Sequence, residues 1–111
     1  MTQEQKELLL KDLCARLPYG VKIKFDSIKE TVFTISELGY LFGSNHDIIP
    51  YLRPMESMTE EEKTYQMKLI KDIKHGANID KLEDFYHSHH FDYRGLIPMG
   101  LALEAPEDMY N

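Results

Sequence analysis

The residues of this sequence with the most chemical potential lie in one run, His87–Asp92, which reads His-Ser-His-His-Phe-Asp. Imidazole and carboxylate groups are good ligands for zinc and other divalent metals, so the run offers a candidate metal site. On a continuing helix His87 and His90 share a face, because they are three residues apart, while the middle histidine points towards the core. A closed site would therefore need a ligand from elsewhere, such as His46 or Glu83.

The spacing around the run matches no recognised ligand motif such as HExxH or CxxC. The same histidines are also typical of a helix end, where the helix dipole favours cations. We therefore predict neither a metal site nor a cofactor. The alternative ligand set is His87, His90, Asp92 and His46.

A second chemical candidate is an acid–base pair of His90 and Asp92, with Tyr93 and Arg94 beside them. The competing interpretation is structural: Asp92 and Arg94 pair with one another or cap backbone groups around a turn, and the aromatic residues pack. The sequence has no nucleophile motif such as GxSxG and no phosphate-binding glycine loop. The prediction therefore leans against an enzyme.

A third candidate is the proline-rich stretch Pro50–Pro54, together with Pro98 and Pro106. Proline and aromatic residues line grooves that bind extended peptides, but they also stiffen connections, and we favour the second interpretation. Residues 106–111 form a polar tail that contains Met109 and Tyr110, an apolar pair that can dock on the domain or on a partner. The residues predicted to form an interaction or structural motif are Tyr51, Arg53, Phe91, Asp92, Tyr93 and Arg94.

The elements that must position these residues begin with a helix that starts at Thr2 and ends near Leu17–Gly20. Thr2 and Gln5 fit a capping box. The predicted buried stripe contains Leu9, Leu10, Leu13, Cys14 and Leu17. Period-two alternation then predicts strands at 21–25 and 31–35 that pair as a hairpin, and further strands at 38–42 and 48–52. Pro50 places the last of these at a sheet edge, since it cannot donate to a ladder.

Two more helices follow, starting at Thr59 and at Asp80. Thr59 and Glu62 form a second capping box, and Gly76 is a candidate C-terminal cap. The predicted buried positions are Tyr65, Leu69, Ile70, Ile73, Leu82, Phe85, Tyr86 and His89. The fold class is therefore α+β: one small domain over 1–111, with a three- to four-stranded antiparallel sheet, about three helices and an irregular C-terminal segment at 90–106 that closes the core.

Composition limits the classes of partner. The chain has 111 residues, a net charge of −6 and one cysteine. The negative charge falls in residues 56–111, so it argues against nucleic-acid binding, for which Lys22, Lys24, Lys29 and Arg53 would have to form the basic face. No apolar run reaches the about 18–20 residues of a membrane span, and residues 1–7 do not resemble a secretory signal. We expect a cytoplasmic protein with no membrane contact.

Several strings in the sequence resemble a group of short bacterial proteins of uncharacterised function. The strings are Pro50–Pro54 followed by Ser57–Glu62, His90–Ile97 with Gly100–Pro106, and Leu17–Lys22. The group is associated with gut bacteria and with their prophages or mobile elements, so the resemblance implies a bacterial cytoplasm. It implies no activity, and His87 and His89 lie outside its motifs.

The function that the sequence favours is a non-enzymatic protein-interaction module of phage or mobile-element origin. The first alternative is a small metal-binding protein or enzyme that uses the His87–Asp92 run. The second alternative is a nucleic-acid-associated accessory protein.

Overall fold

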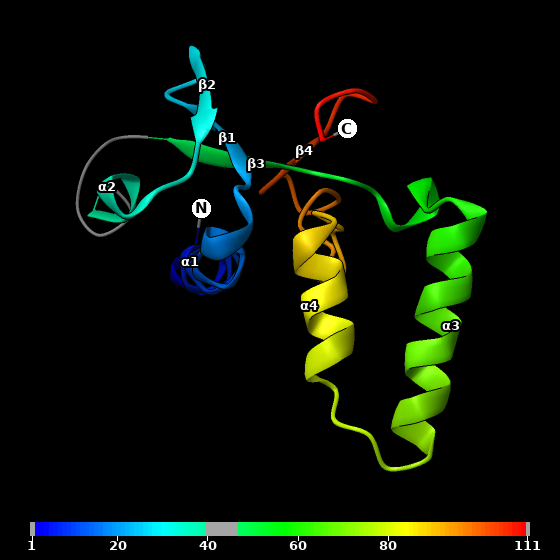
Figure 1. Ribbon diagram of the computed structural model, residues 1–111. Coiled ribbons are helices and arrows are strands. Elements are labelled where there is room, and N and C mark those ends of the chain that lie inside the picture. Colours follow the sequence, from blue (N-terminus) through cyan, green and yellow to red (C-terminus); the bar gives the residue numbers. More distant parts are fainter. Residues whose placement is uncertain (1, 40–46, 111) are drawn as a thin grey trace.

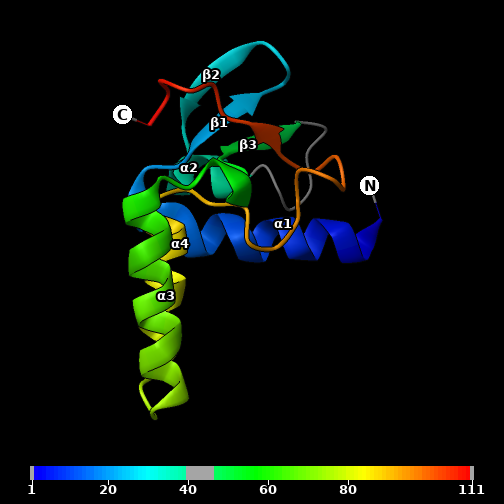
Figure 2. The same ribbon diagram turned by 90° about the vertical axis from the view of Figure 1, so that its right-hand side faces the viewer.

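The computed structural model describes residues 2–39 and 47–110, in which a mixed sheet lies over one helix and a helical hairpin extends away from it (Figures 1 and 2). The sheet order is β2-β1-β3-β4. The helices are α1 (Gln3–Arg16), α2 (Ile35–Leu38), α3 (Glu60–Lys74) and α4 (Asp80–Ser88), and the strands are β1 (Lys22–Phe25), β2 (Lys29–Val32), β3 (Ile48–Leu52) and β4 (Leu103–Glu104). The predicted α+β class is confirmed.

Helix α1 starts at the predicted capping box, in which the Thr2 hydroxyl accepts a hydrogen bond from the Gln5 N–H. Its buried residues are Leu9, Asp12, Leu13 and Arg16. Cys14 is exposed, so its predicted place in the buried stripe is wrong. The reason is rotational: each residue turns about 100° around the helix, and an ion pair, rather than Cys14, completes the buried face beside the two leucines.

Strands β1 and β2 form the predicted antiparallel hairpin, with Lys22 opposite Val32 and Phe25 opposite Lys29. Asp26 and Ser27 make the turn with φ of 54° and 61°, the left-handed region. Strand β2 ends at Val32, earlier than predicted, because Thr34 caps α2 and takes the chain into a helix. Of the strand predicted at 38–42, residue 38 belongs to α2 and residues 40–42 lie outside the described residues.

Strand β3 is an inner strand, so the prediction that Pro50 confines it to an edge is wrong. It pairs antiparallel with β1 through Ile48–Pro50, and parallel with β4 through Tyr51 and Leu52. The Leu52 carbonyl accepts from the Ala105 N–H on the β4 side, at 2.8 Å. Alternate residues of a strand present their backbone groups to the same edge, so the Pro50 nitrogen faces the β4 side, as Leu52 does. Because β4 pairs only with Tyr51 and Leu52, no described strand lies opposite Pro50 on that side, and its missing N–H costs no ladder hydrogen bond. The predicted antiparallel sheet is consequently mixed.

The α3–α4 hairpin has the predicted capping box at Thr59 and Glu62, and Gly76 follows α3 with φ of 99°. Within α3, however, Leu69 is buried, whereas Tyr65 is 47% exposed. The Tyr65 ring still contacts that of Phe85 in α4, with 5.2 Å between the centroids, so the predicted apolar face is covered only in part. No helix among the described residues is long and apolar enough to cross a membrane.

The segment at 90–106 closes both hydrophobic clusters, as predicted. Leu96, Leu101 and Ala102 join the cluster between α1 and the sheet. Phe91 joins the cluster between α3 and α4. Burying each large aliphatic or aromatic side chain stabilises the fold by about 1.5–3 kcal/mol, so this segment is a main part of the core.

Candidate functional site

The structure separates the two histidines that were expected to share a helix face. Helix α4 ends at Ser88, and His90 has φ of 63°, which turns the chain out of the helix. His87 Nε2 lies 2.7 Å from the Tyr93 hydroxyl. Burial lowers the pKa of His87, and the Arg16 guanidinium acts in the same direction. His87 therefore pairs with the phenol of Tyr93 and does not converge with His90.

His90 is buried against the last described segment of the chain. Its ring stacks on that of Tyr110 with 3.7 Å between the centroids. Burial lowers the pKa of His90 to about 4. His46, the further ligand of the metal hypothesis, lies outside the described residues. Across residues 2–39 and 47–110, no three His, Cys, Asp or Glu side chains lie close enough to hold a metal ion together.

Asp92 caps a turn and does not pair with Arg94. Its two carboxylate oxygens accept hydrogen bonds from the Leu96 and Ile97 N–H groups at 2.8 and 2.9 Å. Arg94 instead donates from Nε to Asp12 at 3.1 Å. Of the two structural roles considered for Asp92, the structure therefore has the backbone cap, and the acid–base pair of His90 and Asp92 is not assembled.

A buried ion pair between Asp12 and Arg16 is the polar feature that sequence reasoning missed. Arg16 Nε lies 2.7 Å from Asp12 Oδ2, and both side chains are 0% exposed. Arg16 Nη2 also donates to the Phe91 carbonyl at 2.6 Å. The available signal was an acid and a base four residues apart inside the stripe of Leu9 and Leu13. This network ties α1 to the segment at 90–106, and its burial points to a structural role.

Arg53 forms a second polar connection, on the other side of Phe91. Its guanidinium binds both carboxylate oxygens of Glu62, at 2.8 and 2.9 Å, and lies 4.3 Å above the centre of the Phe91 ring. The hydrogen bonds from Arg53 lower the pKa of Glu62 to about 2. The Arg53 charge is thus compensated within the chain, as expected for a bidentate arginine–carboxylate pair.

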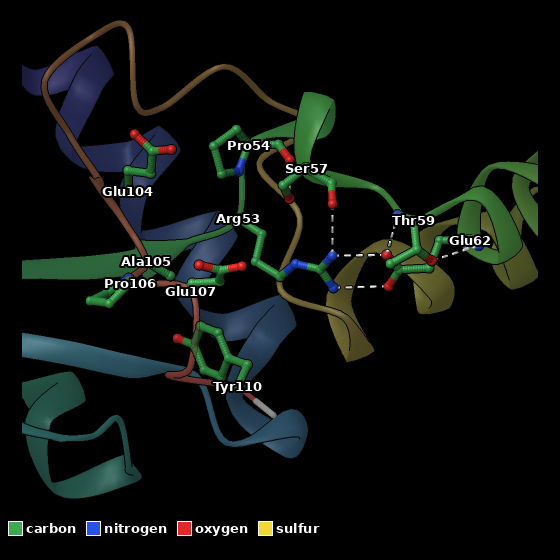
Figure 3. Close-up of a pocket in the computed structure, with 10 residues that line it drawn as sticks. All are labelled: Arg53, Pro54, Ser57, Thr59, Glu62, Glu104, Ala105, Pro106, Glu107 and Tyr110. Atoms are coloured by element: carbon green, nitrogen blue, oxygen red, sulfur yellow. Dashed lines mark hydrogen bonds and ion pairs between the residues drawn. The ribbon is translucent and has the colours of Figure 1, made fainter.

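Arg53 and Tyr110 lie along an open cleft of about 580 Å³, which we call the Arg53–Tyr110 cleft. Figure 3 shows the start of α3 and the turn before it on one side, and β4 with the chain that follows it on the other. The lining residues are Arg53, Pro54, Ser57, Thr59, Glu62, Glu104, Ala105, Pro106, Glu107 and Tyr110. Of the prolines weighed as groove residues, Pro54 and Pro106 line this cleft, whereas Pro50 is buried in β3.

The cleft is acidic. Its lining residues include one arginine and three glutamates, a formal charge of −2. Tyr51, another residue of the predicted motif, is 6% exposed, and its hydroxyl donates to Glu30 at 3.1 Å. No serine or cysteine of the lining stands beside a base that would activate it. The carboxylates of this lining can bind a cation.

Two of the four cations considered for nucleic-acid binding are engaged in contacts inside the chain. Lys22 Nζ donates to the Met109 carbonyl at 3.0 Å, and Arg53 is paired with Glu62. Comparisons with protein-family models, with curated proteins and with solved structures find no match for this chain.

Proposed function

We propose that this chain is a non-enzymatic protein-interaction module that binds an extended, basic segment of a partner protein in the Arg53–Tyr110 cleft. The observation that carries the proposal is the acidic lining of this 580 Å³ cleft: Glu104 lies on its wall, and Arg53, the one lining cation among the described residues, is already bound by Glu62. A volume of roughly 300–1,000 Å³ is usual for ligand sites in proteins.

Electrostatics favour a basic partner. Residues 56–111 carry the whole net charge of −6, and the cleft lies largely within this half of the chain. A lysine or arginine side chain placed beside Glu104 would gain charge-assisted hydrogen bonds without displacing Arg53 from Glu62. The same field would also raise the association rate of a basic segment.

The form of the site favours an extended segment. Glu104 belongs to β4, the last strand in the order of the described sheet, and β4 borders the cleft. An extended peptide can add to such an edge through main-chain hydrogen bonds, while adjacent pockets select its side chains. With the resemblance to prophage-associated proteins, we place this module in a bacterial cytoplasm and propose a phage or mobile-element origin.

The test is binding of a fluorescein-labelled octapeptide of alternating lysine and alanine, with alternating glutamate and alanine as the opposite-charge probe. We expect the basic peptide to bind at least about tenfold more tightly at low salt, with the difference shrinking as salt screens the charges. Glu104→Lys and Glu107→Lys should each weaken binding of the basic peptide.

The control variant is Glu7→Lys, which reverses an exposed charge on α1 that does not line the cleft. It changes net charge by the same amount as each cleft variant, so it separates local recognition from general attraction. Equal binding of the two peptides, or equal effects of Glu7→Lys and Glu104→Lys, would overturn the proposal.

A further inference from the structure

The ladder between β1 and β3 stops one pair short of where β1 begins. The paired residues are Phe25 with Ile48, Lys24 with Ile49, and Ile23 with Pro50. The next pair in this register would be Lys22 with Tyr51. In an antiparallel ladder, hydrogen-bonded and non-hydrogen-bonded pairs alternate, and a pair containing proline falls among the latter. Lys22 and Tyr51 would therefore be expected to exchange backbone hydrogen bonds.

The Tyr110 hydroxyl occupies the position of that missing hydrogen bond. The Lys22 N–H donates to Tyr110 Oη at 2.9 Å, and Tyr110 Oη donates to the Tyr51 carbonyl at 2.7 Å. A hydroxyl both donates and accepts, so it satisfies the two strands at once. Without it, a half-buried N–H and a half-buried C=O would both lose their partner.

The rest of the last described segment, Pro106–Tyr110, is held at the same place. We call this segment the strap. The Met109 carbonyl accepts from Lys22 Nζ at 3.0 Å, and the Tyr110 ring stacks on His90. Burial raises the pKa of Tyr110 to about 12, so its hydroxyl remains a donor at neutral pH. The anchor therefore persists under ordinary solution conditions.

The strap is also a wall of the Arg53–Tyr110 cleft. Pro106, Glu107 and Tyr110 all line it, opposite the turn that leads into α3 (Figure 3). Upstream, the chain is fixed to β3 by the hydrogen bond from the Ala105 N–H to the Leu52 carbonyl. The wall thus runs between one backbone hydrogen bond at Ala105 and the hydroxyl bridge at Tyr110.

We infer that Tyr110 is a positioning residue of the binding cleft: its hydroxyl bridges Lys22 and Tyr51, and this bridge fixes the strap that forms one wall of the cleft. Its effect on binding rests on the proposed function, whereas the anchoring itself does not. The two parts are therefore measured separately.

The test variant is Tyr110→Phe, which keeps the ring and its stacking on His90 but removes the hydroxyl. We expect amide hydrogen exchange to become about tenfold faster or more at Lys22 and along the strap, while exchange in α3 and α4 is unchanged. Affinity for the lysine–alanine octapeptide should fall several-fold. Tyr19→Phe is the matched control, because it removes a hydroxyl that donates to Asp84 at an exposed site, and it should change neither quantity.

Lys22→Met is a second variant, which removes the hydrogen bond to the Met109 carbonyl and keeps the backbone N–H. This variant should also speed amide exchange along the strap and weaken binding of the lysine–alanine octapeptide. Unchanged exchange at Lys22 in Tyr110→Phe would overturn the anchoring, whether or not any peptide binds. Faster exchange with undiminished or tighter peptide binding would show that the strap does not position the cleft. A wild-type chain that binds no basic peptide would refute the proposed function alone.

Discussion

Lowering the pH from 7.5 to 4.5 should destabilise the fold by about 2.5 kcal/mol through one buried imidazole, that of His90. The His90 side chain is 8% exposed, and its Nδ1 has no hydrogen-bond partner among the described residues. Besides burial, the positive charges of Arg16, Arg53 and Lys22 also lower its pKa. A proton on His90 is therefore unfavourable in the folded state.

The magnitude follows from the two pKa values of this group. In the unfolded chain a histidine titrates near about 6.5, whereas burial lowers the pKa of folded His90 to about 4. Between these values the unfolded state binds a proton that the folded state does not, so the free energy of unfolding falls as pH falls. The stabilisation is complete above pH 6.5. About 2.5 kcal/mol is lost by pH 4.5, and about 3 kcal/mol once the pH is below both values.

The assay is urea unfolding followed by far-ultraviolet circular dichroism, at intervals between pH 7.5 and 4.5. His90→Asn removes the titrating group, and asparagine tolerates the left-handed φ of 63° at this position. This variant should be less stable at pH 7.5 but should lose much less stability on acidification. His75→Asn, which removes an exposed imidazole at the end of α3, is the control and should keep the wild-type pH dependence. The same slope in His90→Asn as in the wild-type chain would refute the reasoning.

Three further predictions concern stability. Arg94→Ala removes one partly exposed contact to Asp12 and should cost about 1 kcal/mol in urea unfolding, whereas Asp12→Ala leaves Arg16 buried without its carboxylate and should cost about 3–5 kcal/mol; equal costs would contradict the assigned burial. Glu62 has its pKa lowered to about 2 by Arg53, so its contribution is present above about pH 4.5 and is lost as pH falls towards 2. Glu62→Gln should therefore reduce the loss of stability with falling pH in that range, and the same pH dependence as in the wild-type chain would argue against the Arg53–Glu62 pair. Chelator should leave the melting temperature of untagged protein within about 1 °C, and stoichiometric metal with a shift of several degrees would restore the metal hypothesis.

Local sequence rules predicted the starts of α1 and α3 correctly because their causes are local. The capping boxes at Thr2 and Thr59 are each complete within four residues, and both are present in the structure. The β1–β2 hairpin is similarly local. The place of β3 in the sheet was predicted wrongly for the opposite reason. Its neighbour β4 lies about fifty residues further along the chain, and the pairing of Leu52 with Glu104 leaves no trace in the pattern around Pro50.

The Asp12–Arg16 pair shows the same limit for a site. An acid and a base four residues apart on a helix usually mark a solvated face. The partner that compensates for the burial of Arg16 is the Phe91 carbonyl, 75 residues away, which accepts a hydrogen bond from it. Only the folded chain brings that carbonyl to α1, so the sequence could identify the helix but not the side that its charges occupy.

The distribution of polar contacts also explains why the chemically rich run at 87–94 is not the best candidate site. His87 contacts Tyr93, Asp92 caps a turn, and Arg94 reaches Asp12, so these groups are used to fix the chain around the buried Phe91. The proposed recognition uses a neighbouring surface whose glutamates carry no sequence signature of their own. Substitutions within 87–94 should therefore act first on stability, whereas charge reversal at Glu104 should act on binding.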